Sequence, residues 1–503
     1  MKRAFDEATP DETGSRLRPQ VVVAVLAFGG IVVSLMQTLV IPLVPVLPEL
    51  LGATPGDTAW AITATLLAAA IATPTVGRLG DMYGKRRMLL ISLAVLVAGS
   101  VFCALATNLS IMVVGRVLQG LAAGVIPLGI SIMRDVLPPE RLGGATALMS
   151  ASLGVGGALG LPAAAFVVQK ADWHVMFWVA AALAAVAGVL VRLLIPDTGV
   201  RTGGRFDLIG SLGLSVALLL LLLAVSKGSD WGWGSGVPGA MLVVAAVVLV
   251  VWGWWELRTS QPLVDLRVSV RRQVLLTNTA SVMFGFSMFA MSLVVPQVIQ
   301  LPEVTGYGFG RTILIAGLVM APNGLVMMAM SPISARISRA RGPKTTLMAG
   351  ALLVASGYGM SVVLMSGLWQ LMIASTIIGA GVGLAYGAMP ALVMAAVPLS
   401  ETAAANSLNT LMRSIGTSVA SAVAGVVIAN VTMSAGGEVF PARDAFTLIL
   451  GLGALAALTA FVIAAFLPGR AKATAPVEPE PVQRSGARGG EPKEASALAQ
   501  DQP

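Results

Sequence analysis

Fourteen stretches of about twenty mostly apolar residues follow one another along this 503-residue chain. A helix needs about 20 apolar residues to cross the hydrocarbon core of a bilayer. Charged residues make up only 11% of the chain, whereas soluble proteins carry about 25%. The sequence therefore predicts an all-α polytopic membrane protein. The predicted spans are 20–41, 58–77, 88–106, 109–133, 143–168, 174–195, 208–226, 237–255, 274–299, 312–331, 346–366, 369–396, 405–431 and 445–467. The narrow breaks at 106/109 and 366/369 are the ones on which this count depends most.

The basic residues alternate between the two sides of the predicted spans. If the N-terminus is cytoplasmic, 26 of the 32 Lys and Arg residues fall in cytoplasmic segments and four fall in outer ones. Because cytoplasmic loops collect Lys and Arg, the distribution predicts that both termini are cytoplasmic. It also argues against a nucleic-acid partner, since short scattered basic clusters are typical of contact with anionic lipid.

Several kinds of chemistry lack the residues they require. A single cysteine, Cys103, excludes a disulfide framework, and a single histidine, His174, excludes metal sites built on histidine pairs. Gly84-Lys85 is followed by Arg86 rather than Ser or Thr, so no phosphate-binding loop is present. The predicted spans bring together no nucleophile and base, and we expect neither an enzyme nor a cofactor.

Two charged segments half a chain apart are similar. Residues 74–90 align without gaps with residues 332–348 at an offset of 258, and "SLGVGGALG" aligns with "SIGTSVASA" at an offset of 262. Parallel six-helix repeats of this kind describe one class of secondary transporter. The sequence thus predicts a cytoplasmic segment 1–19, a six-helix bundle 20–195, two extra spans 208–255, a second bundle 274–467 and a disordered cytoplasmic tail 469–503.

Three segments resemble signature motifs of the major facilitator superfamily. "GRLGDMYGKRR" (77–87) resembles motif A, "GRVLQGLAAG" (115–124) resembles motif B, and "GVGGALGLPAAAF" (154–166) resembles a degraded motif C. "SKGSDWGW" (226–233) and "WELRTSQPLVDLRV" (255–268) look like the fourteen-helix drug–proton antiporter branch. The resemblance covers residues 20 to 467 and implies a multidrug-efflux type of transporter.

The motif A segment, residues 77–87, is expected to be a loop that joins two long helices by a tight turn. The resemblance implies that Asp81 bonds the neighbouring bundle and holds the outward-open state, as a conformational latch. The alternative is a solvated loop that only obeys the charge rule for cytoplasmic loops. Arg339 stands where the second repeat would need Asp81. The residues assigned to the latch are Gly77, Asp81, Gly84, Lys85 and Arg86.

Two cations fall inside predicted spans, where a charge is costly unless it faces protein or water. The resemblance assigns Arg116, with Gln119 and Gly120, a part in proton transfer or substrate binding; a structural arginine bonding backbone carbonyls is the alternative. Arg413 has two open roles, substrate contact or helix packing. The candidate substrate cavity is lined by Gln37, Thr38, Asn278, Asn323, Asn409 and Arg413. The motif C residues expected in tight helix packing are Gly156, Gly157, Gly160 and Pro162.

The chain departs from its branch where drug–proton antiporters carry "LDxTIVNVALP". Met36 replaces the Asp, Ile41 replaces the Asn, and Leu161 precedes Pro162 where the family has Gly. The predicted spans have no Asp or Glu near their middle, which disfavours lipophilic cations as substrates.

We therefore expect a bacterial plasma-membrane exporter of an anionic, zwitterionic or neutral small molecule, such as an antibiotic. It would act as a monomer that contacts only the bilayer, its substrate and protons. Any proton carrier would lie at the membrane edge, with Asp81, Asp135 or Glu49 as candidates. Uptake of a metabolite by the same fold is the main alternative.

Overall fold

The computed structural model describes residues 19–43, 47–58 and 60–468. Within these ranges fourteen segments are long and apolar enough to cross a membrane, which confirms the predicted number. They are α1 (Pro19–Thr38), α4 (Trp60–Tyr83), α5 (Lys85–Ala104), α6 with α7 (Leu109–Leu121 and Val125–Val136), α8 (Pro139–Lys170), α9 (His174–Leu194), α10 (Leu208–Trp231), α11 (Val237–Arg258), α13 (Arg272–Gln300), α14 with α15 (Ile313–Ala329 and Ser331–Arg341), α16 (Pro343–Val363), α17 (Leu368–Met394), α18 (Thr402–Asn430) and α19 (Arg443–Ala465). The segments expected before Pro19 and after Pro468 lie outside the described residues.

Short elements connect these spans. Both narrow breaks are real: Asn108 caps α6 by accepting a hydrogen bond from the Ile111 backbone N–H, and four residues separate α16 from α17. A two-stranded antiparallel hairpin, which the sequence did not predict, joins α18 to α19. The short elements are η1 (Ile41–Leu43), α2 (Leu47–Leu51), α3 (Pro55–Thr58), η2 (Ala122–Gly124), η3 (Trp233–Ser235), α12 (Leu266–Ser269), η4 (Glu303–Thr305), η5 (Leu399–Glu401), β1 (Thr432–Ala435) and β2 (Glu438–Pro441).

The motif A segment is not a loop, which corrects the expectation from sequence. Helix α4 continues to Tyr83 and α5 begins at Lys85, so Gly84 alone forms the turn, with a φ of 109°. Gly342 forms the matching turn between α15 and α16 with a φ of 88°, again at the offset of 258 seen in the sequence. Residues other than Gly rarely adopt such angles. The charged residues of both segments therefore stand on helices, where their directions are fixed.

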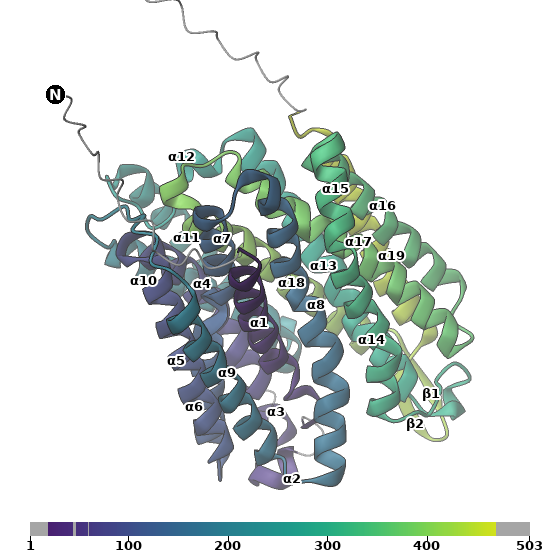
Figure 1. The fold of residues 1–503 in the computed structure, drawn as a ribbon. Helices are drawn as coiled ribbons and strands as arrows, with labels where there is room; N and C mark the ends of the chain where they lie inside the picture. Colours follow the sequence, from purple (N-terminus) through teal and green to yellow (C-terminus); the bar gives the residue numbers. More distant parts are fainter. Residues whose placement is uncertain (1–18, 44–46, 59, 469–503) are drawn as a thin grey trace, which may run out of the picture. The chain divides into compact units, whose positions relative to one another are not determined.

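Three apolar cores hold the helices together. The first is formed mainly by residues 22–195 and the second mainly by residues 280–467. Figure 1 shows α5, α6 and α9 side by side in the first group and α16, α17 and α19 in the second, in agreement with their packing. The exact boundaries of the two bundles stay a prediction.

The third core joins one of the two extra spans to both groups. Leu214, Leu218 and Leu222 of α10 pack against Leu67 of α4 and Leu411 of α18. The hydroxyls of Thr75 and Ser211 also lie 3.1 Å apart, which ties α10 to α4 by a polar contact. Helix α10 therefore covers the line along which α4 and α18 meet.

Candidate functional site

The Asp81 carboxylate lies against the first turn of α18. Its Oδ1 accepts a hydrogen bond from the Ala403 N–H at 3.2 Å and its Oδ2 accepts one from the Ala404 N–H at 2.8 Å. These N–H groups have no carbonyl partner inside their helix, and the N-terminus of a helix favours negative charge. Asp81 is fully buried, so this contact across more than 300 residues of chain is shielded from water.

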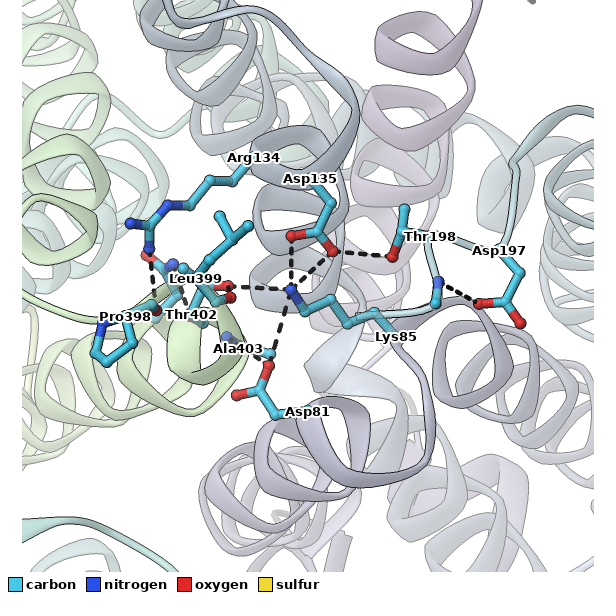
Figure 2. A network of polar contacts seen from close by, with 12 residues as sticks. Asp81, Lys85, Arg134, Asp135, Asp197, Thr198, Pro398, Leu399, Thr402 and Ala403 are labelled. Atoms are coloured by element: carbon cyan, nitrogen blue, oxygen red, sulfur yellow. Dashed lines mark hydrogen bonds and ion pairs between the residues drawn. The ribbon is translucent and has the colours of Figure 1, made fainter. Parts of the chain in front are cut away.

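Lys85 lies at the centre of the polar network that surrounds this contact (Figure 2). Its Nζ is 2.8 Å from both carboxylate oxygens of Asp135 on α7, 3.2 Å from Thr402 Oγ1 and 4.0 Å from Asp81 Oδ1. Thr198 donates a further hydrogen bond to Asp135 Oδ2 at 3.1 Å. The side chains of Lys85, Asp81 and Asp135 are all buried, and a buried ammonium needs such partners to offset the loss of hydration.

The surrounding backbone also joins the two sides of this site. Arg134 donates one hydrogen bond to the Val397 carbonyl at 3.1 Å and another to the Pro398 carbonyl at 3.4 Å, just before η5. Figure 2 shows the contact with Pro398. Gly77 packs so closely on α18 that an added Cβ would lie 2.9 Å from the Ala403 carbonyl oxygen. At this end of the molecule, named here the Gly84 end, α4, α5 and α7 are thus joined to α18. Arg86 is not part of this network: its guanidinium donates to the Arg192 carbonyl on α9.

Arg116 is enclosed among helices α1, α4 and α6 and is 1% exposed. Its Nε donates to the Ala61 carbonyl at 2.8 Å, and its Nη1 donates to the Met36 carbonyl at 2.9 Å and to Gln119 Oε1 at 2.6 Å. Gly120 lets α4 approach, since a Cβ there would contact Ala68 at 2.7 Å. The part of Arg116 in proton transfer or substrate binding stays a prediction, and this geometry supports the structural alternative.

Arg413 has a different environment on α18. Its guanidinium lies 4.6 Å from the centre of the Tyr386 ring, a cation–π contact. Its polar partner is the Thr410 hydroxyl at 3.4 Å, and the residue is only partly buried. Unlike Arg116, Arg413 keeps hydrogen-bonding capacity for another group.

The other expected cavity residues do not all meet. Asn409 donates to Asn278 Oδ1 at 2.9 Å and to Ser281 Oγ at 2.7 Å, so two of them pair between α18 and α13. Thr38 instead donates to the Gly156 carbonyl of α8 at 3.3 Å. Gln37 is half-buried on α1, and Asn323 lies on α14 against Gly379.

The motif C helix α8 lies between α1 and α14. A Cβ at Gly156 would lie 2.7 Å from the Leu35 backbone nitrogen, and one at Gly160 would collide with Thr38. Pro162 packs on Gly317 of α14, whereas Gly157 has open space beside it. Small residues thus let both neighbouring helices approach closely, as expected for tight packing between membrane helices.

Comparison with known proteins decides the family. The family model described as Major Facilitator Superfamily matches residues 26–205 and 199–421, which together are most of the chain. This chain belongs to the major facilitator superfamily.

Individual superfamily members are similar at a moderate level. The MFS-type transporter Rv1877 of Mycobacterium tuberculosis is 27% identical over 83% of this chain and 60% of its own length, so the chain spans about three fifths of that relative. The tetracenomycin C resistance and export protein of Streptomyces glaucescens is 27% identical over 85% of this chain and 79% of its own length. The crystal structure of the human organic anion transporter MFSD10 (TETRAN) matches 89% of this chain and 99% of that chain, with a TM-score of 0.62 and 17% identity, and supports the fold alone.

The fourteen candidate membrane spans of the described residues agree with membership of this superfamily. Thr198, Thr402 and Tyr386 could not be assigned to a site from sequence, although all three contact predicted site residues or their partners. One sequence feature could have marked Tyr386 as a site residue: it is the single polar aromatic residue in the glycine-dense segment "GAGVGLAYG". The two threonines had none, since their partners are distant in the chain.

Replacing Asp81 by Asn should weaken the contact between α4 and α18. The amide lacks the charge that the helix terminus and Lys85 stabilise, a loss of about 1–2 kcal/mol, so the open population should rise about tenfold. Ser407 is buried against Gly77, so a cysteine at this position, in a Cys103→Ser background, reacts with maleimide only when the α4–α18 contact opens. Asp81→Asn should therefore speed the labelling of this cysteine. The matched control is Asp197→Asn, a half-exposed carboxylate at the same end, which should leave labelling unchanged. Equal labelling in all three proteins would contradict the assignment.

Arg116 and Arg413 should respond differently to the same substitution. Lysine cannot reproduce the forked contacts of the Arg116 guanidinium, so Arg116→Lys should destabilise the protein by about 2–4 kcal/mol. Arg413→Lys should cost less than about 1 kcal/mol, because it mainly weakens one ring contact. Thermal unfolding of the purified proteins, followed by tryptophan fluorescence, measures both. A similar loss in the two variants would show that Arg413 is as structural as Arg116.

Proposed function

We propose that this transporter exports an anionic, zwitterionic or neutral small molecule across a bacterial plasma membrane by alternating access, coupled to proton entry. The chain works as a monomer with both termini in the cytoplasm. The strong excess of Lys and Arg in alternate connecting segments supports this orientation. Two bundles, residues 20–195 and 274–467, rock about a site between them.

The contact of Asp81 with the start of α18 is the observation that carries this proposal. A transporter that alternates between two conformations needs an interface that is specific when formed and that opens at a small cost in free energy. The carboxylate makes two hydrogen bonds to α18, and Lys85 pairs with Asp135 within the first bundle, whereas Arg134 bonds the Val397 carbonyl across the contact. Opening the Gly84 end therefore separates few polar groups, and it leaves Lys85 paired with Asp135. In the proposed cycle Asp81 holds the outward-open state.

The charges inside the spans support the choice of substrate. Arg413, stacked on Tyr386 and partly exposed, offers a cation and an aromatic face to an acidic or aromatic compound. Among the spans that the structure describes, no Asp or Glu lies near the middle, so a lipophilic cation would find no balancing charge there.

The direction of transport is supported by the relatives. Several carry names such as multidrug resistance protein, and one is a tetracenomycin C resistance and export protein. Antibiotic export is therefore favoured, and uptake of a metabolite by the same fold is the alternative.

Transport into vesicles of defined orientation tests the proposal. Inside-out membrane vesicles containing the protein, acidified inside by respiration, should accumulate tetracenomycin C and acidic antibiotics, and a protonophore should abolish the accumulation. Vesicles carrying Asp81→Asn should accumulate several-fold less, and vesicles without the protein none. Accumulation only in right-side-out vesicles would establish uptake instead. Robust ethidium export without transport of acidic or neutral compounds would contradict the proposed substrate class.

A further inference from the structure

Two carboxylates lie together where the extra helices α10 and α11 begin and end. Asp207 is the N-cap of α10 and accepts a hydrogen bond from the Gly210 N–H at 2.8 Å. Glu256 lies in the last turn of α11 and is only 2% exposed. An added Cβ at Gly210 would collide with Asp207 Oδ2 and lie 2.7 Å from Glu256 Oε1. The two side chains therefore face each other across Gly210.

Glu256 lacks the partners that a buried anion requires. Neither of its carboxylate oxygens makes a hydrogen bond of good geometry, and neither touches solvent. Asp207 differs, because it accepts from the Trp255 indole at 3.1 Å and is partly exposed. An unpaired carboxylate beside a second carboxylate is disfavoured both by burial and by like charge.

No cation near this pair balances Glu256 among the described residues that pack on α11. Arg258 stacks on the Trp254 ring at 4.1 Å, and Arg267 donates to the Leu257 carbonyl at 3.0 Å. Asp265, which caps α12, accepts from the backbone of Arg267 and Val268. The charged group that acts on Glu256 is Asp207.

The segment 259–265, between α11 and α12, connects this pair to the Gly84 end. The backbone N–H groups of Leu263 and Val264 and the indole of Trp252 face the Glu256 carboxylate, beyond good hydrogen-bonding geometry. The same segment also lines a cavity of about 260 Å³, which it shares with Arg78, Glu401 and Ala404. Ala404 is one of the two residues whose N–H groups bond Asp81.

We propose that Glu256 is a proton-binding site, reached through the more exposed Asp207, that reports its protonation to the α4–α18 contact through the segment 259–265. The ligand is a single proton that binds a carboxylate oxygen of Glu256. The ionised carboxylate attracts the Leu263 and Val264 N–H groups and draws the segment toward α11, because hydrogen bonds to a charged acceptor are the stronger ones. When Glu256 is protonated this attraction weakens, and the segment 259–265 is free to move beside the start of α18. The proposal rests on the proposed proton coupling and places a proton-sensing site in helices that lie outside both bundles.

Infrared difference spectroscopy of the full-length protein in lipid nanodiscs tests proton binding without any substrate. A pH titration of the wild type should show the C=O band of a weakly hydrogen-bonded carboxyl group. Glu256→Gln should remove this band, and Glu303→Gln, a matched change of an exposed glutamate, should retain it. A titrating band that is unchanged in Glu256→Gln, or no such band in the wild type, would overturn the assignment.

Hydrogen exchange tests the link to the segment. Glu256→Gln imitates the neutral acid, so the Leu263 and Val264 amides should exchange about tenfold faster, as expected from the loss of one charge-assisted interaction. Glu303→Gln should leave their exchange unchanged. Unaltered exchange in Glu256→Gln would refute the coupling even if the site binds a proton.

Transport separates this inference from the proposed function. In proteoliposomes, Glu256→Gln should lose accumulation of tetracenomycin C driven by a pH gradient but keep exchange of internal for external compound. Gradient-driven accumulation equal to wild type would overturn the role of Glu256 in coupling. If the wild-type protein moves no compound, the proposed substrate fails, while the infrared and exchange results still decide the proton site.

Discussion

The backbone N–H groups in the first turn of α18 have no carbonyl acceptor within the helix, and the Asp81 carboxylate accepts hydrogen bonds from two of them. This one interaction sets the relation between α4 and α18. It places Gly77 directly on Ala403 and Ser407, and it brings Thr402 to the Lys85 ammonium. The neighbouring buried charges are also paired, because each one near Asp81 has a partner within a few ångströms. A membrane interior offers no water to replace such partners, so their arrangement restricts which helices can meet at this end.

The extra helices add a second layer to this arrangement. Helix α10 covers the line where α4 and α18 meet and is bound to both by its leucines. The segment that leads into α10 also crosses the network, since Thr198 donates to Asp135 and the Thr202 N–H donates to the Asp81 carbonyl. Glu256, in the last turn of α11, lies beside the start of α10. The two additional spans therefore contact the network at the Gly84 end, and our account gives them a part in proton coupling.

The number and approximate ends of the spans could be predicted from sequence, because apolar length and the distribution of basic residues are local properties. The turn at Gly84 was also visible, although the helix that carries Asp81 was mistaken for part of a loop: "GRLGD" is polar enough to resemble a connection. The partners of Asp81 could not be derived from spacing, since Ala403 is more than 300 residues away and its contribution is a backbone N–H that any residue type would supply. For the same reason the sequence could not show whether Arg116 bonds backbone carbonyls or takes part in proton transfer or substrate binding. The burial of Glu256 could not be derived from sequence, because it depends on how α10 and the segment 259–265 pack around it.

The central claim is that Asp81 holds one of two interconverting arrangements of α4 and α18. The most direct test is the distance between spin labels at Tyr83→Cys and Leu399→Cys, two exposed positions on opposite sides of the contact, in a Cys103→Ser background in lipid nanodiscs. Our account predicts two distance populations in the otherwise unaltered protein, with the shorter one dominant, and a shift toward the longer one when Asp81 is changed to Asn. A single distance that is the same in both proteins would contradict it.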